Sequence, residues 1–238
     1  MLRQSFIIAA RVMRQLVRDR KPVALILVVP LVIMFLIGAS LPDTSILNYI
    51  TPALLATLSL IFGFLLTSVS FLRERFQGTM ERPMAAPVSH LYIVLGYLFG
   101  FFVFALAQTL IIILFTIYML DASYYGDLWQ IFIFRIIIII GAVNLGIFIS
   151  TFARNEFQVV QFIPLLIVPQ IFLCGVIWPV EQMPGYLQWL SNVLPLTYAM
   201  DVLREIMVNA RNLIDVGADL TVLVAFAFVM SILATLTV

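Results

Sequence analysis

Unbroken apolar runs of about twenty residues are the feature that most constrains the fold of this chain. A helix rises about 1.5 Å per residue, so roughly 20 residues cross a hydrocarbon core of about 30 Å. Six runs reach or approach that length: 23–41, 52–72, 91–120, 131–152, 157–176 and 220–238. None contains Lys, Asp or Glu, and the one basic residue within them is Arg135. We therefore predict an all-α integral membrane protein with six transmembrane helices, forming a single domain over residues 1–238.

Composition excludes the other broad classes of protein. Hydrophobic residues make up 63% of the chain and charged residues 11%, against about 45–50% and about 25% in soluble domains. A chain this apolar is not disordered, and it is not a nucleic-acid-binding protein. A single cysteine and a single histidine exclude an intrachain disulfide and a zinc site built from these residues. A membrane β-barrel needs strands that alternate apolar and polar residues, and these runs do not alternate.

Basic residues predict the orientation of the spans, because cytoplasmic loops carry an excess of Lys and Arg. Most fall before the first run, between the second and third, and between the fourth and fifth, at Arg3, Arg11, Arg14, Arg18, Arg20, Lys21, Arg73, Arg75, Arg82 and Arg154. The long connection between the fifth and sixth runs has only Arg204 and Arg211, against five acidic residues. The alternate loops, 42–51 and 121–130, have no Lys or Arg and carry three aspartates. We expect both termini in the cytoplasm and the acidic loops outside, in a multi-pass protein of the plasma or inner membrane.

Residues 1–21 are too charged to span a membrane and show helical amphipathicity. On a helical wheel one face holds Leu2, Phe6, Ala9, Met13 and Leu16, and the opposite face holds Arg11, Arg14, Arg18 and Lys21. This pattern predicts an interfacial helix on the cytoplasmic leaflet, with its basic side toward lipid phosphates or a partner. The alternative is a basic tail that only sets the topology.

The segment 71–90, FLRERFQGTMERPMAAPVSH, lies between the second and third runs and is longer than a helix connection needs. Its mixed charges and its glycine suit a surface on which a soluble partner docks. From the residues alone, a solvated connector is an equal alternative.

Three separated motifs resemble the ABC-2 type transporter permeases. RERFQGTMERPMAAPVS is similar to a cytoplasmic motif of that family, and NEFQVVQ, followed by PVEQMP and LPLTY, is similar to a second block. The opening VRDRKPVALILVVP resembles the family's entry to the first span. Pro83 departs from the pattern, because the family has leucine or another helix former there. The resemblance covers nearly the whole chain.

The resemblance implies a permease subunit of an ATP-binding-cassette exporter. In that family the loop between spans two and three is a coupling helix, here within 73–90, which sits in a groove of a separate ATPase. Carried over by position, the residues at or beside that contact are Glu74, Arg75, Gly78, Thr79, Glu81 and Arg82. This chain has no G-x-x-x-x-G-K-[ST] phosphate loop. ATP and Mg are therefore expected on the partner ATPase, with no cofactor here, and a second permease subunit would complete a homodimer or heterodimer.

Residues 177–212 are broken by prolines yet rich in aromatic side chains. Aromatic residues concentrate at membrane–water interfaces. The resemblance implies a re-entrant helical hairpin that dips in from the outer face, and the alternative is a pair of surface helices.

Few polar residues interrupt the spans, and three of them are candidates for a substrate pathway: Gln108, Arg135 and Asn144. In-span polar residues more often bond neighbouring helices. Arg135 lies six residues after Trp129, so we expect its charge to snorkel toward the outer headgroups. The alternative role for Arg135 is contact with anionic cargo near the exit.

We interpret the chain as a transport permease, not an enzyme, that exports an amphipathic or hydrophobic substrate of drug, antibiotic, lipid or glycan type. No hydrolase or metalloprotease motif is present. A secondary, ion-coupled transporter is the main alternative, but it would place carboxylates within the spans, and these runs hold none. A non-transport membrane scaffold is the remaining alternative.

Overall fold

The computed structural model describes residues 2–18, 20–41, 44–76, 90–120 and 125–237, and within these ranges every regular element is a helix. This confirms the all-helical class. The first half holds α1 (Leu2–Arg18), α2 (Arg20–Ser40), α3 (Thr44–Phe76), α5 (His90–Met119) and α6 (Leu128–Ser150). The second half holds α7 (Glu156–Leu166), α8 (Val168–Leu173), a short 3₁₀ turn η1 (Val180–Gln182), α9 (Gly185–Ser191), α10 (Pro195–Met207) and α11 (Gly217–Thr237).

Five stretches are long and apolar enough to cross a membrane: Ser45–Phe76, Val94–Met119, Leu128–Ser150, Glu156–Leu173 and Gly217–Thr237. They correspond to the second through sixth predicted spans. The first predicted span falls on α2, whose described apolar part is Leu27–Ser40. The fifth is divided at Ile167 into α7 and α8, where two prolines, Pro164 and Pro169, each remove a backbone donor.

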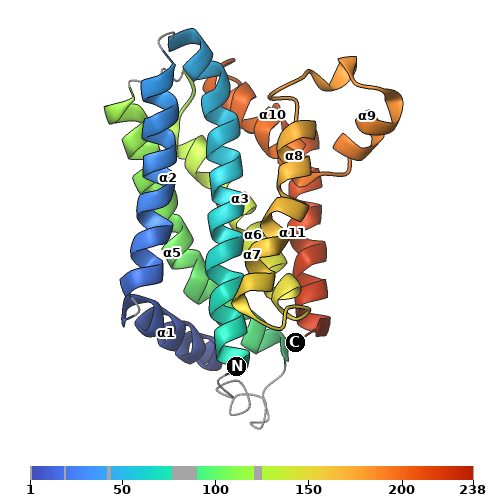
Figure 1. Cartoon of the computed structure of the whole chain (residues 1–238). Helices are drawn as coiled ribbons and strands as arrows, with labels where there is room; N and C mark the ends of the chain where they lie inside the picture. Colours follow the sequence, from blue (N-terminus) through green and yellow to red (C-terminus); the bar gives the residue numbers. More distant parts are fainter. Residues whose placement is uncertain (1, 19, 42–43, 77–89, 121–124, 238) are drawn as a thin grey trace.

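The helices form one bundle, with α1 lying across one end of it (Figure 1). Both chain termini, the end of α3 and the start of α5 lie at this end. We call it the terminal end of the bundle. The segments around α9 and α10 lie at the opposite end, so the structure places the basic N-terminal helix and the region 177–212 on opposite sides.

Helices α3 and α6 form the centre of the bundle, and small residues let their backbones approach closely. A Cβ added to Gly63 would lie 3.1 Å from Ala142. One added to Gly146 would lie 2.9 Å from both the Phe64 carbonyl oxygen and the Thr67 Cβ. Without a hydrophobic driving force between helices in lipid, close packing of this kind is a main source of association.

Helix α1 packs against α5 through a stripe that is rotated from the one expected. Ala9, Val12 and Leu16 are buried, whereas Phe6 is 70% exposed. The reason is that Gly96 and Gly100 of α5 have no side chains, so the α1 backbone packs closely against them. A Cβ added to Gly96 would lie 3.0 Å from the Ser5 carbonyl oxygen of α1. The G-x-x-x-G pair therefore serves packing within the subunit.

The region 177–212 combines an exposed part with a buried one. Helix α9 projects from the bundle (Figure 1), and Trp178, Tyr186 and Trp189 on this part are exposed. Helix α10 folds back against α3, α6 and α11, with Leu203 and Ile206 fully buried.

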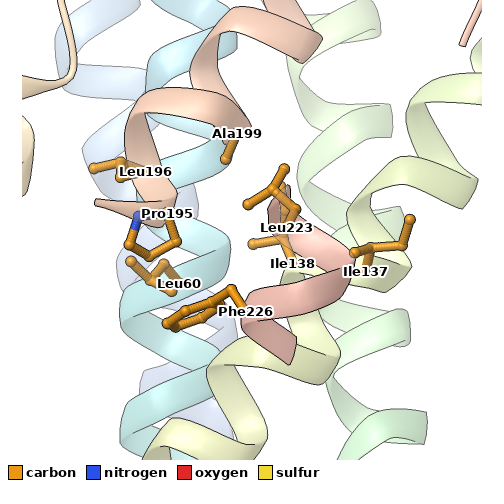
Figure 2. A pocket seen from close by; sticks show the side chains of 8 residues that line it. All are labelled: Leu60, Ile137, Ile138, Pro195, Leu196, Ala199, Leu223 and Phe226. Carbon is orange, nitrogen blue, oxygen red and sulfur yellow. The ribbon is translucent and has the colours of Figure 1, made fainter. Parts of the chain in front are cut away.

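The start of α10 reaches deep into the bundle. Pro195 and Leu196 line a small apolar cavity together with Leu60, Ile138 and Phe226 (Figure 2). Ile138 lies ten residues, or about 15 Å, along α6 from its first residue. Because Pro195 lines the same cavity as Ile138, the start of α10 lies at about that depth from the end of the bundle where α6 begins.

Candidate functional site: a surface joining two motifs at the terminal end

The last turn of α3 carries RERF, residues 73–76, which begin the first motif. The side chain of Arg73 contacts Glu156 at the start of α7. Arg73 donates to the Glu156 carboxylate twice, from Nε at 2.6 Å and from Nη2 at 3.0 Å. This two-point geometry suits the planar guanidinium and fixes the relative orientation of the two groups. The pair is partly solvent-exposed, so it positions the two segments more than it stabilises the fold.

A second arginine of the same motif ties α3 to the end of α6. Arg75 Nη1 donates to the Thr151 carbonyl oxygen at 2.7 Å. An orphan carbonyl at a helix C-terminus carries partial negative charge, so a cation is a favourable partner. The two arginines together bind both sides of the α6–α7 turn.

The α6–α7 turn is itself held in shape by its own polar residues. The Asn155 side chain caps α7 by accepting from the Gln158 amide at 2.8 Å. The Gln158 side chain accepts from the amide of Arg154, the residue before the cap, at 2.7 Å. The first bond caps α7 and the second holds the end of the turn against its first turn.

The RERF and NEFQ motifs therefore meet in one surface, although 83 positions separate Arg73 from Glu156. An open groove of about 300 Å³ runs between them, lined by Leu72, Arg73, Phe76, Arg154, Asn155 and Glu156. Its lining combines apolar side chains with charges of both signs. Such a surface is suited to a protein partner with complementary charges.

Glu74 points away from this groove, into the bundle. It is 2% exposed, accepts from the Tyr97 hydroxyl, and lies 3.3 Å from Arg11 Nη2. One carboxylate therefore connects the end of α3 with α1 and α5. Of the residues predicted to contact an ATPase, Arg75 lies on the exposed surface, and Gly78, Thr79, Glu81 and Arg82 lie outside the described residues. Their role stays a prediction.

The three candidates for a substrate pathway are all buried, on two different helices. Asn144 on α6 donates to the Ile140 carbonyl oxygen at 2.9 Å and to Ser231 Oγ at 2.8 Å. Gln108 on α5 is 4% exposed, and its Nε2 has no partner among the described residues. The bond from Asn144 to Ser231 joins α6 to α11, as in-span polar residues commonly do. A pathway role for the three residues stays a prediction.

Arg135 does not snorkel outward in this conformation, so that expectation is wrong. Its side chain is fully buried and its Nη2 donates to Ser59 Oγ, which places the guanidinium between α3 and α6. Helix α10 packs against both helices, and its Leu196 and Leu203 share one apolar core with Phe134, the neighbour of Arg135. Within the described part of the chain, Nε and Nη1 of Arg135 have no hydrogen-bond partner.

Two small apolar cavities lie near Arg135. The cavity in Figure 2 is lined in part by Ile138, which lies one helical turn after Arg135. The other is lined in part by Ile131, one turn before Arg135. Each has a volume of about 10 Å³, which holds no more than one water molecule. Neither admits a cargo molecule. In the described ranges, no group of three or more His, Cys, Asp or Glu side chains is placed to hold a metal ion.

Comparison with known proteins decides the family. Residues 3–208 match the family described as ABC-2 type transporter, which is most of the chain. The chain belongs to the ABC-2 type transporter family. The ABC-2 match spans both motifs that the structure joins at the terminal end.

Three relatives of this ABC-2 chain are informative. ABC transporter G family member 20 of Dictyostelium discoideum is 28% identical over 172 residues, 72% of this chain and 24% of that protein. The probable multidrug ABC transporter permease YbhS of Escherichia coli K12 is 23% identical over 181 residues, 76% of this chain and 48% of the relative. The linearmycin resistance permease protein LnrN of Bacillus subtilis 168 is 27% identical over 158 residues, 66% of this chain and 41% of LnrN. The chain spans less than half the length of these relatives.

Sequence reasoning found both motifs of this ABC-2 chain but not the contact between them. It assigned Arg75 and Glu74 to one docking surface and left Arg73 and Glu156 without roles. The available signal was charge complementarity: both segments belong to the basic loops that the sequence predicts on the same side of the membrane, and Glu156 is the acidic residue of the second. Tyr97 carried no signal, because an aromatic residue in an apolar run is ordinary.

Proposed function

We propose that this chain is the permease subunit of an ABC exporter and moves an amphipathic or hydrophobic substrate outward with ATP hydrolysed by a separate ATPase subunit. The observation that supports the proposal most is the joined surface of the RERF and NEFQ motifs at the terminal end. A partner that pushes on the segment after α3 would also move α7, because Arg73 and Arg75 hold the two together. ATP and Mg would be bound by the partner, and two permease subunits would enclose the transport pathway.

The proposed topology has six spans, with α2 as the first. Both termini and α1 face the cytoplasm, and α9 and α10 form a re-entrant region on the outer side. Two features support the re-entrant assignment: the exposed aromatic side chains near α9, and the start of α10 about 15 Å inside the bundle. Non-helical backbone at that depth is tolerated where protein buries it, and α3, α6 and α11 surround this part.

The cargo class rests on the walls of the bundle and on the names of relatives. The described spans are strongly apolar, and two relatives are named as a multidrug permease and a linearmycin resistance permease. We propose an apolar or amphipathic organic molecule of drug, antibiotic, lipid or glycan type.

The coupling assignment predicts a loss of ATPase binding on substitution of the segment after α3. We expect Gly78→Trp and Glu81→Lys each to lower capture of the ATPase in detergent and export at least tenfold. A bulky side chain would separate the two surfaces, and a reversed charge would replace attraction by repulsion. Copurification of the ATPase and export from intact cells are the measurements.

Matched controls come from the opposite end of the bundle. Gly185→Trp adds the same bulk where nothing lies within 4 Å of an added Cβ, and Glu181→Lys reverses an exposed charge. Both should keep wild-type ATPase capture. If Gly78→Trp and Glu81→Lys capture the ATPase as well as these controls do, the coupling assignment is wrong.

Orientation is tested by cysteine labelling in a Cys174→Ser background. We expect cysteines at Asp43 and Asp127 to react with a membrane-impermeant thiol reagent in intact cells, and a cysteine at Gln77 to react only after permeabilisation. Labelling of the Gln77 position in intact cells would reverse the proposed orientation.

A further inference from the structure

Helix α1 has a surface that no described helix covers, and this surface changes character across its width. One strip is apolar, with Phe6 and Val17 exposed at 70% and 65%. The adjacent strip is basic, with Arg14 and Arg18 exposed. Residues 13 and 17, and likewise 14 and 18, are one turn apart and so form neighbouring rows along the helix.

An open groove of about 590 Å³ follows the border between these two strips. It is lined by Ala10, Met13, Arg14, Val17 and Arg18. One wall is therefore apolar and the other carries two guanidinium groups. Helix α1 has no acidic residue, and Arg14 and Arg18 form no ion pair with any residue in the described ranges.

The neighbours of α1 place this groove at the edge of a span. The Phe6 ring stacks on Phe99 of α5, with their centroids 6.3 Å apart. Phe99 is five residues, or about 8 Å, inside the span that begins at Val94. Phe99 and Val103 are both exposed on the outer surface of the bundle, where lipid tails would lie. The apolar strip of α1 therefore continues a lipid-facing surface, with its basic strip beside it.

We propose that the groove binds an anionic phospholipid, with the phosphate held by Arg14 and Arg18 and the start of an acyl chain on Met13 and Val17. Charge complementarity selects the anion, because the two guanidinium groups have no ion-pair partner among the described residues and no carboxylate on α1 competes. The apolar wall selects a lipid over a free anion. Arg11 has a different role, because it pairs with Glu74.

A titration of the purified full-length chain tests this site. The probes are fluorescent phosphatidylglycerol and phosphatidylcholine with the same acyl chains, added in a neutral detergent. We expect wild type to prefer phosphatidylglycerol. One basic residue near an anionic lipid contributes about fivefold in affinity, so Arg14→Gln/Arg18→Gln should weaken phosphatidylglycerol binding about 25-fold and leave phosphatidylcholine binding unchanged.

The control removes one exposed charge elsewhere, as Arg211→Gln, and should stay within twofold of wild type, whereas Arg14→Gln alone should lose about fivefold. Val17→Gln should weaken binding of both lipids, because it makes the apolar wall polar. Equal loss in the control variant would mean general charge attraction and would overturn the proposal. Full competition by millimolar inorganic phosphate would overturn the lipid assignment and leave an anion site. Unchanged thermal unfolding of each variant confirms that the loss is in the site, since Arg14, Arg18 and Arg211 are all exposed.

Discussion

Gly146→Leu is expected to prevent assembly of the α3–α6 pair or to lower its thermal unfolding temperature in detergent by about 10 °C. The physical reason is backbone contact. A Cβ at position 146 would lie 2.9 Å from the Phe64 carbonyl oxygen and 3.3 Å from the Ser68 amide nitrogen, and neither can rotate away as a side chain could. Forcing two central helices apart costs about 4 kcal/mol, and a chain of this size loses about 2–4 °C per kcal/mol.

Gly217→Leu is the matched control for this prediction. Gly217 also lies in a helix, but nothing is within 4 Å of an added Cβ, so leucine should leave the unfolding temperature within about 2 °C of wild type. The smaller change Gly146→Ala should fall between the two leucine variants. Wild-type stability of Gly146→Leu would show that α3 and α6 pack differently from the arrangement described here.

Arg135→Met is expected to raise the unfolding temperature while lowering export at least tenfold. The guanidinium is fully buried, its one described hydrogen bond is to Ser59, and Nε and Nη1 have no described partner. Replacing a buried charge with an apolar side chain of similar length is often stabilising by about 1–4 kcal/mol, because the desolvation penalty disappears. We expect loss of export because residues that destabilise a fold, such as a buried charge with few partners, are found mainly at functional positions.

Ser59→Ala is the companion variant for Arg135. It removes the hydroxyl acceptor and leaves the charge in place, so it should lower the unfolding temperature. In the double variant Ser59→Ala/Arg135→Met, the loss caused by Ser59→Ala should vanish, because no charge remains that needs the hydroxyl as an acceptor. If Arg135→Met instead unfolds at a lower temperature, the guanidinium stabilises the fold, and if it exports normally, the charge has no part in transport.

The motif that resembles the family predicted the region of the candidate site but not how its residues are used. Arg73, Glu74 and Arg75 are consecutive on α3 and therefore point in different directions around the helix. Arg73 and Arg75 reach the α6–α7 turn, while Glu74 turns inward to Tyr97 and Arg11. A motif in the sequence treats such residues as one group, whereas on the helix each side chain contacts a different neighbouring segment.

Arg135 shows a second limit of sequence reasoning. Its distance from Trp129 along α6 predicted outward snorkelling on the assumption that lipid surrounds the helix. The structure instead places α10 over this part of the bundle. No local pattern in 131–152 records that a segment sixty positions later folds back on it.

The sequence by itself determined that this is a helical membrane chain, where its long apolar helices lie, and which family it belongs to. Those properties depend on local quantities: the length of each apolar run, the charges between runs and short motifs read in order. Only the tertiary structure decided that α1 packs on Gly96 and Gly100, that Glu156 pairs with Arg73, and that Arg135 is enclosed. In a chain whose helix faces are nearly all apolar, hydrophobic periodicity does not select a partner, so the choice falls to small residues, to the few polar groups and to the fit of whole helices.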